Sequence, residues 1–417
     1  MAFNTFIMDR VERWAKLYEN SERLTRPYSI NNVLARQEMI DLEKSVVKII
    51  NCFLDKAELH KGIKIYTNNH QRNDLVEKMA KMRPAITESL KDWGVKIFGQ
   101  ERYGVVFNSL EAYDNTISEI MSFVVSPLIK KAGLPLGGLS FLFFMGNYGF
   151  TPFGIHKEAK GEEGFLFHLG PAEKVFYTWD NEELNKIEHN TKVFHEELKD
   201  MLPSSKEYVL KPGSVMFIPH QVYHIAKTEE FSLSIVMDYI NPSRDLLEKE
   251  LAKEISAQEY PQNLSDSYLN PIQLDGTGKG SESSLDVQSI MKKYRIALDR
   301  RVTMLKSNGG LLNPAIKNHK KLLPNGEFSF KGKEAFPICI NEPAEDSIII
   351  YARGNEIKRK SNPYLNTIIS SLNNGEVLTF EYLKEQLMPQ WDLVEIYSLI
   401  SDLLVIEAIK IFESNHP

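Results

Sequence analysis

A His-x-Glu triplet and one distant histidine are the residues of this sequence whose types and spacing suit metal chemistry. His156 and Glu158 are two positions apart, so on a strand both side chains leave the same face, whereas on a helix they would diverge by about 200°. Residues 151–154, Thr-Pro-Phe-Gly, cannot continue a helix and therefore favour the strand. His224 opens a further strand after a Pro-Gly turn and an apolar run. Two histidines and one carboxylate predict a facial triad that leaves open positions on Fe(II).

The segment that supplies the distant histidine contains a second one, His220, which is the competing ligand. The segment runs from Pro212-Gly213 through an apolar stretch, residues 215–218, to Pro219 and then to the two histidines. His224 is the better placed of the two because it opens the next strand beyond the turn. A His-x-Glu triplet alone arises by chance in many chains. Its combination with this segment, and with strands on both sides, predicts a bound metal.

The composition is that of a soluble globular protein without a bulk preference for nucleic acid or membranes. The chain has 417 residues, enough for two or three domains, with 42% hydrophobic and 25% charged residues and a formal net charge of −6. Its two cysteines, Cys52 and Cys339, lie far apart without metal-type spacing, which suits a reducing compartment. The N-terminus lacks a basic segment followed by an apolar core, and no apolar run reaches the ~18 residues that span a bilayer. We therefore expect a cytoplasmic protein with no membrane and no nucleic-acid partner.

The predicted elements place the triad in a region of strands, residues 101–242, that follows a mainly helical region, residues 1–100. Residues 165–169 and 174–179 are expected to form a hairpin across Gly170-Pro171. The strand that closes the region alternates between an apolar and a polar face. Its apolar positions are Phe231, Leu233, Ile235 and Met237, and its polar positions are Ser232, Ser234 and Asp238.

Two further parts follow, a helical connector at residues 243–310 and a winged-helix-like domain at residues 311–417. The connector contains a charged helix, residues 243–257, and a second helix, residues 285–305, separated by a polar linker. The last domain ends with three helices and a strand, which is the order of a winged helix. From residue 361 onward the chain has eight acidic residues and two basic ones, which gives a net charge of −6. This charge argues against DNA binding and favours contact with protein.

The sequence resembles the JmjC-type 2-oxoglutarate oxygenases, and within them the ribosomal-oxygenase group of protein hydroxylases. The resemblance covers roughly residues 100 to 412. It lies in residues 105–111 ahead of a helix, Phe150 with His156-x-Glu158, residues 165–169 ahead of Lys174, and the Pro212-Gly213 to His224 segment. It implies an α+β fold whose double-stranded β-helix, a cupin-like jelly-roll barrel, holds Fe(II) through His156, Glu158 and His224. It also implies 2-oxoglutarate as co-substrate and dioxygen as oxidant.

The resemblance further implies that Lys174 pairs with the far carboxylate of 2-oxoglutarate. Residues 175–177, Val-Phe-Tyr, favour an inward and paired ammonium, because an unpaired buried charge is costly. The alternative is a solvated charge on the hairpin. Ser140, Asn147 and Ser234 are candidate hydrogen-bond partners of the co-substrate.

Three features depart from the pattern of the family. Glu158 stands where the family usually has aspartate, which adds one methylene and keeps the charge and the oxygen donors. Lys174 lies eighteen residues after His156, somewhat further than the pattern, so small insertions must lie between them. His168 stands where the group often has glutamine. It is either a core histidine with a hydrogen-bonded ring or a residue that lines the substrate pocket.

Three functions are compatible with these observations. The first is hydroxylation of an amino-acid side chain in a protein or peptide, by a homodimer joined through residues 243–306. The second is oxygenation of a small molecule or free amino acid, or tailoring of a ribosomally made peptide whose leader the last domain captures. The third is a non-catalytic barrel used for interaction, because Glu158 departs from the usual residue. The sequence identifies neither the substrate nor the residue modified.

Overall fold

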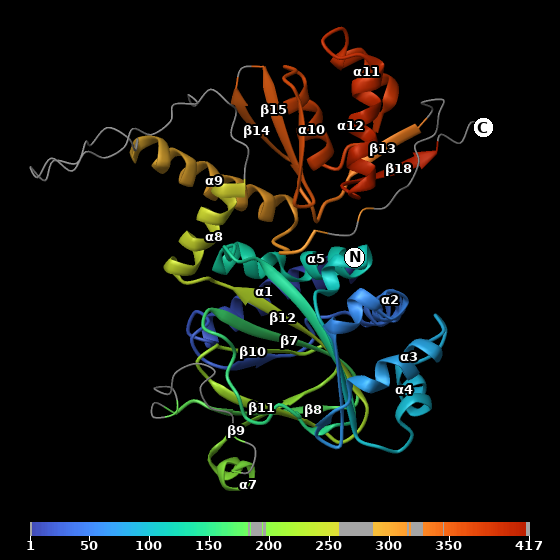
Figure 1. The fold of residues 1–417 in the computed structure, drawn as a ribbon, viewed down its shortest axis with the longest axis vertical. Coiled ribbons are helices and arrows are strands. Elements are labelled where there is room, and N and C mark those ends of the chain that lie inside the picture. The colour runs from blue at the N-terminus through green and yellow to red at the C-terminus, as the bar shows by residue number, and fades with distance from the viewer. Residues whose placement is uncertain are drawn as a thin grey trace, which may run out of the picture.

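The centre of the molecule is a barrel of two antiparallel sheets that lie one above the other (Figure 1). The computed structural model describes residues 2–181, 184, 194, 197–257, 287–314, 317, 328–344 and 346–413. The large sheet has the order β1 (Tyr28–Ile30), β10 (Val215–Ile218), β7 (Glu162–Pro171), β12 (Ser232–Ile240), β5 (Leu139–Gly146), β4 (Tyr103–Phe107), β2 (Ile63–Thr67), β3 (His70–Gln71). The small sheet has the order β6 (Gly149–Phe150), β11 (Tyr223–Thr228), β8 (Lys174–Trp179), β9 (Lys206–Leu210). The predicted α+β class is confirmed.

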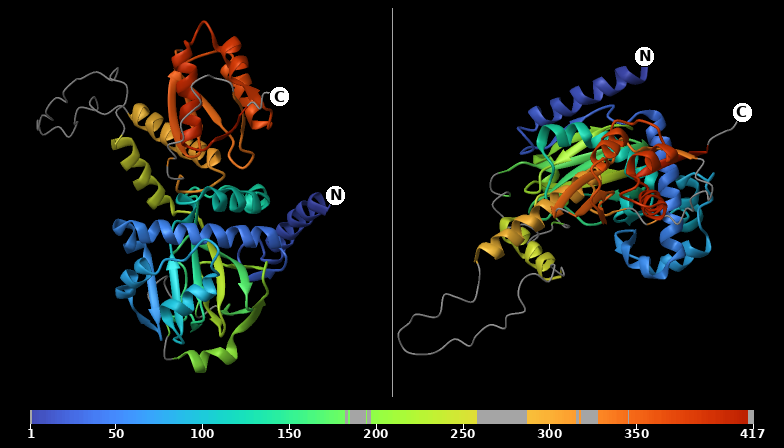
Figure 2. Two further views of the ribbon diagram at one scale, coloured as in Figure 1. Left: turned by 90° about the vertical axis from the view of Figure 1, so that its right-hand side faces the viewer. Right: turned by 90° about the horizontal axis from the view of Figure 1, so that it is seen from above.

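The strands of the large sheet present an apolar face to a layer of helices. The three long helices α1 (Ala2–Asn20), α2 (Arg36–Asp55) and α5 (Asn115–Ala132) cover this face, as Figure 2 shows from two sides. Leu233, Ile235 and Met237 of β12 belong to the shared core, which confirms the predicted alternation of this strand. Because side chains alternate along a strand, the intervening residues point between the two sheets. The interior of the barrel therefore receives the polar positions of β12.

The predicted hairpin between residues 165–169 and 174–179 is wrong. Strand β7 pairs with β10 on one side and with β12 on the other, so both of its hydrogen-bonding edges are occupied. Strand β8 pairs instead with β11 and β9 in the opposite sheet. Gly170, whose φ of +93° favours glycine, lies where the chain crosses from one sheet to the other.

The N-terminal residues share the core of the large sheet. Strands β1, β2 and β3 extend this sheet, and the first two helices pack on it. The shorter helices of the N-terminal and barrel regions are α3 (Val76–Lys81), α4 (Leu90–Phe98) and α7 (Leu198–Met201), with 3₁₀ turns η1 (Ala57–Gly62), η2 (Asn73–Leu75), η3 (Leu110–Ala112) and η4 (Leu202–Ser204).

Two helices that contact each other connect the barrel to a C-terminal domain that has its own apolar core. The connecting helices are α8 (Arg244–Ala257) and α9 (Val287–Ser307), and Arg301 of α9 pairs with Glu250 and Glu254 of α8. The domain contains two three-stranded sheets and three helices. One sheet has the order β14 (Cys339–Ala344), β15 (Ser347–Ala352), β16 (Asn355–Lys360), and the other has the order β17 (Leu378–Thr379), β13 (Phe328–Gly332), β18 (Ile409–Glu413). The helices are α10 (Leu365–Asn373), α11 (Phe380–Leu387) and α12 (Leu393–Val405). Its classification as a winged helix stays a prediction.

The C-terminal domain lies against the helical side of the barrel, away from the small sheet (Figure 1). Arg353 is fully buried at this junction, where its guanidinium lies 3.6 Å from the centre of the Phe336 ring and donates to Asn308 and Asn115. Buried Glu111 accepts a hydrogen bond from Asn313 Nδ2 at 2.8 Å. These contacts fix the domain relative to the barrel. Among the described helices, none has the length and apolar character needed to cross a bilayer.

Candidate metal centre

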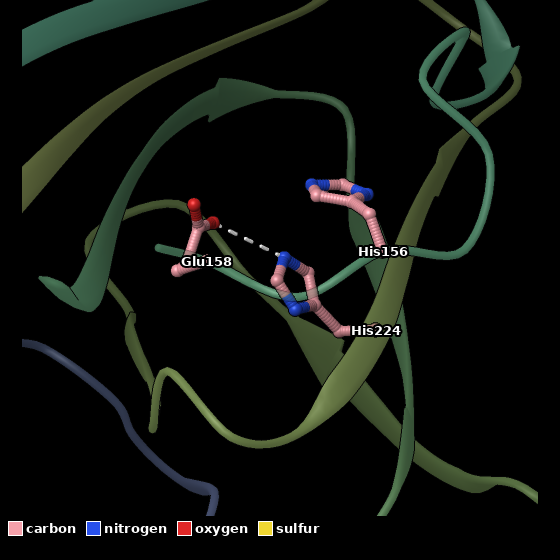
Figure 3. Close-up of side chains that lie close together, drawn as sticks. All are labelled: His156, Glu158 and His224. Carbon is pink, nitrogen blue, oxygen red and sulfur yellow. Dashed lines mark ion pairs between the residues drawn. The ribbon is translucent and has the colours of Figure 1, made fainter. Parts of the chain in front are cut away.

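His156, Glu158 and His224 meet inside the barrel (Figure 3). The backbones of the two histidines form a reciprocal pair, His156 N to His224 O at 3.1 Å and His224 N to His156 O at 2.9 Å, which places their rings 4.5 Å apart. Glu158 Oε1 lies 3.4 Å from His224 Nε2. One ligand atom from each residue lies within 4.8 Å of the others. In the part of the chain that the structure describes, no second group of three such ligands occurs.

The orientation of both imidazoles suits metal binding through Nε2. His156 Nδ1 lies 2.8 Å from the Gly154 carbonyl oxygen, and His224 Nδ1 lies 3.2 Å from that of Val222. A carbonyl oxygen only accepts, so each Nδ1 carries the proton and donates it. Nε2 is then the nitrogen that remains to bind a metal ion, which would displace the proton that His224 Nε2 shares with Glu158, and a hydrogen bond on one ring nitrogen is the usual way in which the other is oriented as a ligand.

The carboxylate of the triad stays ionised in this enclosed position. Burial by itself raises the pKa of Glu158, but the hydrogen bond to His224 and the charges of His224 and His156 outweigh burial and bring its pKa to about 2. An ionised carboxylate is the form that binds a cation. The site therefore offers two nitrogen donors and one anionic oxygen donor.

His220 lies outside this group. Its ring Nδ1 is 2.7 Å from Glu163 Oε1, and its backbone N donates to Glu163 Oε2 at 2.9 Å. His224 is in β11, where alternate residues face the interior, whereas His220 lies in the turn before that strand. Of the two histidines considered from the sequence, the structure brings His224 to the triad.

A cavity of about 490 Å³ opens on the triad between the two sheets. Its walls come from alternate positions of strands in both sheets, as the barrel geometry requires. Apolar and aromatic side chains form most of the wall, among them Leu142, Phe144, Tyr148, Leu166, Phe176 and Val236. A cavity of this size and character can hold a small organic acid and a side chain.

Lys174 is fully buried beside this cavity, so its interpretation as a solvated hairpin charge is wrong. Its Nζ lies 5.7 Å and 5.5 Å from the ring centres of Phe144 and Tyr148, which line the cavity. Nζ donates to Ser234 Oγ at 2.8 Å. Burial lowers the pKa of Lys174 to about 7. A buried amine with one neutral hydrogen-bond partner is suited to pair with an anion.

His168 lies behind Lys174 and does not line the cavity. Its Nε2 is 2.6 Å from the Ala172 carbonyl oxygen and must donate, which leaves Nδ1 to accept from Ser234 Oγ at 3.2 Å. Burial, and then the charge of Lys174, lower the pKa of His168 to about 3, so the ring is neutral. The sequence left two interpretations open, and the structure places this residue as a buried histidine hydrogen-bonded on both sides.

Ser140 and Asn147, the other two candidate co-substrate partners, make hydrogen bonds within the protein. Ser140 Oγ donates to Glu111 Oε1 at 3.2 Å. Asn147 Oδ1 accepts from Tyr103 N at 3.0 Å, and so connects the turn after β5 to β4. Neither residue lines the cavity. Their place as binding residues stays a prediction.

Three polar residues of the interior were not assigned to the site from the sequence. The Tyr148 hydroxyl and the Thr178 hydroxyl are buried and have no hydrogen-bond partner among the described residues. Thr178 pairs with His224 across β8 and β11, and lies on the same face of β8 as Lys174. Asp238 lines the cavity from β12. Strand periodicity could have indicated Thr178, because it follows Lys174 by four residues.

The raised pKa of Asp238 predicts how the stability of the protein without metal or co-substrate changes with pH. Burial, and then the charges of Glu158, Glu162 and Glu111, raise its pKa from 3.8 to about 8. The folded state thus binds a proton more tightly than the unfolded state, so this group costs stability progressively as pH rises from about 4 to 8. Asp238→Asn is expected to raise the Tm of the metal-free protein by roughly 2–4 °C or more at pH 8 and very little near pH 4. Thermal unfolding at the two pH values measures this.

Glu229→Gln is the matched control for this prediction. The pKa of Glu229 is lowered, first by its hydrogen bond to Lys227, so the sign of its contribution is opposite. Removing this charge should not stabilise the protein at pH 8. An equal gain for Asp238→Asn at both pH values would contradict the assignment.

No protein-family model matches the sequence, and no curated protein matches it. The X-ray structure of E. coli ycfD aligns with 95% of this chain and 98% of its own, at 12% identity and a TM-score of 0.50. The crystal structure of Escherichia coli ribosomal oxygenase YcfD aligns with 93% of this chain and 95% of its own, at 11% identity and a TM-score of 0.47. A structure of YcfD in complex with cobalt and 2-oxoglutarate aligns with 93% of this chain and 94% of its own, at 11% identity and a TM-score of 0.45. The first likeness shows the fold, which agrees with the cupin-like barrel that the sequence resemblance implied.

Proposed function

We propose that this chain is an Fe(II)- and 2-oxoglutarate-dependent oxygenase that hydroxylates an amino-acid side chain in a protein or peptide. The observation that carries the proposal is the convergence of His156, Glu158 and His224 in a cavity bordered by the buried amine of Lys174. The fold of a protein named ribosomal oxygenase supports the same class.

The three side chains fit a divalent iron. Two imidazoles that present Nε2 and one ionised carboxylate form the donor set of the facial triad, which leaves positions open on the metal. Glu158 has one methylene more than the aspartate of the family, yet its oxygen reaches the two histidine nitrogens. The longer side chain is therefore compatible with binding, and the non-catalytic alternative loses its main support.

The interior also fits a dicarboxylate co-substrate. A carboxylate beside Lys174 would accept from its Nζ and give the unpartnered hydroxyl of Tyr148 an acceptor. YcfD has been crystallised with cobalt and 2-oxoglutarate, and we transfer this pair of ligands to the present chain as part of the proposal.

The protein residues position the reactants and exclude water. The iron, when bound, supplies the redox chemistry that couples decarboxylation of 2-oxoglutarate to oxygen transfer from dioxygen. Lys174 holds the far carboxylate, and Ser234 fixes the direction of its Nζ. Phe144, Leu166 and Phe176 form apolar walls that keep bulk water from the reacting atoms.

Formation of succinate tests this proposal. Purified protein loaded with Fe(II) should convert 2-oxoglutarate to succinate, and faster in the presence of a peptide substrate than without it. The metal content and the product are measured together. Protein that binds iron and 2-oxoglutarate but never forms succinate would contradict an enzymatic role, whereas turnover stimulated by free amino acids alone would favour a small-molecule substrate.

We further propose that the chain forms a homodimer through α8 and α9. Large apolar side chains are exposed on these two helices, namely Leu246, Ile290, Met291 and Ile296, and a second copy would cover them. Light scattering should give twice the chain mass of 47.9 kDa. Combined Ile290→Glu and Met291→Glu substitutions should give the monomer, while Val377→Glu, on the C-terminal domain, should not. A monomeric parent protein would rule out this interface.

A further inference from the structure

We propose that the cavity between the helical layer of the barrel and the C-terminal domain binds a small organic anion with an apolar, ring-containing body. The cavity has a volume of about 720 Å³, and its walls come from α1, α5, the turn after α9 and residues 334–339 of the C-terminal domain. It shares no lining residue with the cavity at the metal centre. Figure 1 shows α5 directly below the C-terminal domain. Junctions between domains are common places for ligand sites, and volumes of about 300–1,000 Å³ are typical of them.

Most of the wall is apolar. Contributions come from Val11 of α1, Phe123 and Ile129 of α5, Leu134 after that helix, and Pro337 of the C-terminal domain. Val11 is 51% exposed, so part of this apolar surface is open to water. A ligand with an aromatic or aliphatic body would remove this surface from water, which favours its binding.

The charged residues of the wall carry an excess of positive charge. They are Arg10, Lys130, Lys306 and Glu334. Arg10 is paired with Glu38, which leaves two lysines and one carboxylate, and none of these three has an ion pair with a described residue. The lysines therefore exceed the carboxylate by one charge. A ligand with a single negative charge would balance this excess.

The wall also contains a hydrogen-bond acceptor that lacks its usual donor. Pro127 lies inside α5 and has no N–H, so the carbonyl oxygen of Phe123 does not receive the helical bond from the fourth residue after it. Both residues line the cavity. An N–H or O–H group on the ligand would have an acceptor there. The site therefore suits an anion whose apolar rings carry a hydrogen-bond donor.

This ligand would touch the helices of the barrel and the C-terminal domain at the same time. A molecule that binds only the assembled junction stabilises it by mass action. Binding needs neither metal nor 2-oxoglutarate, so the inference does not depend on the proposed function.

The test uses the full-length protein and 8-anilinonaphthalene-1-sulfonate, an anion with two ring systems and an N–H group. Its fluorescence should rise on binding, with saturation at one site per chain. The neutral probe N-phenyl-1-naphthylamine has the same rings and N–H group without the sulfonate. It should bind at least about fivefold more weakly, because exposed lysines each contribute modestly to ion pairing. Equal affinity of the two probes, or no binding of the anionic one, would overturn the proposal.

Lysine variants locate the binding site of the anionic probe. Combined Lys130→Gln and Lys306→Gln substitutions should weaken it by about fivefold or more and leave the neutral probe nearly unchanged. Lys131→Gln is the matched control, because Lys131 is the next residue of α5 and does not line the cavity. Lys174→Ala, at the other cavity, should also bind the probe like the parent. Unchanged binding in the double variant, or loss of binding in either control, would overturn the assignment to this cavity.

Discussion

His224→Ala is expected to abolish metal retention. Among the described residues three side chains converge as donors, and this substitution removes one of them while the backbone pair with His156 stays. Loss of residues that merely support a ligand costs about 10–100-fold in affinity, so loss of the ligand itself should exceed about 100-fold. The measurement is the metal content of protein loaded with Mn(II) or Fe(II) and then passed through a desalting column, where the parent should keep one ion per chain.

His220→Ala is the matched control because it changes the same residue type four positions away. His220 bonds to Glu163 and lies outside the triad, so this variant should retain most of its metal. Circular dichroism confirms that both variants are folded. Metal loss in His220→Ala with retention in His224→Ala would mean that the turn after Pro219 has a different register.

The sequence was sufficient to predict the triad because its signal is local. Two residues at a spacing of two, a proline-glycine turn and an alternating strand each depend only on near neighbours. The polar face of β12 was likewise predictable from its alternation, and the structure places Ser234 and Asp238 on it. Local pattern also gave the two connector helices to within two residues at each end.

Pairing between strands could not be predicted in the same way. Residues 165–169 and 174–179 read as a hairpin because only a glycine-proline turn separates the two segments. Whether adjacent strands pair depends on which distant strands compete for their edges, and β10 and β12 occupy both edges of β7. Asn147 and Ser140 were similarly judged by residue type alone. Their partners, Tyr103 and Glu111, are 44 and 29 positions away.

Lys174→Ala is expected to weaken 2-oxoglutarate binding by two to three orders of magnitude while metal binding persists. Lys174 is buried, and within the described residues its Nζ has only Ser234 as a hydrogen-bond partner. Removing the cation would leave the far carboxylate desolvated and unpaired, at a cost of about 3–5 kcal/mol. Anaerobic isothermal titration of 2-oxoglutarate into Mn(II)-loaded protein measures the change. Lys174→Arg should recover part of the loss, because it keeps the charge and changes the shape.

The pH dependence of binding separates a charge effect from a general loss of packing. In the free protein burial holds the pKa of Lys174 at about 7, whereas a bound carboxylate favours the ammonium and raises that pKa. Binding therefore takes up a proton above pH 7. The affinity of the parent should be nearly constant below pH 7 and fall by up to about tenfold per pH unit above it. In Lys174→Ala this slope should disappear, and in Lys174→Arg it should flatten, because the guanidinium stays charged. An alanine variant that binds as tightly as the parent, with the same slope, would show that another group holds the far carboxylate.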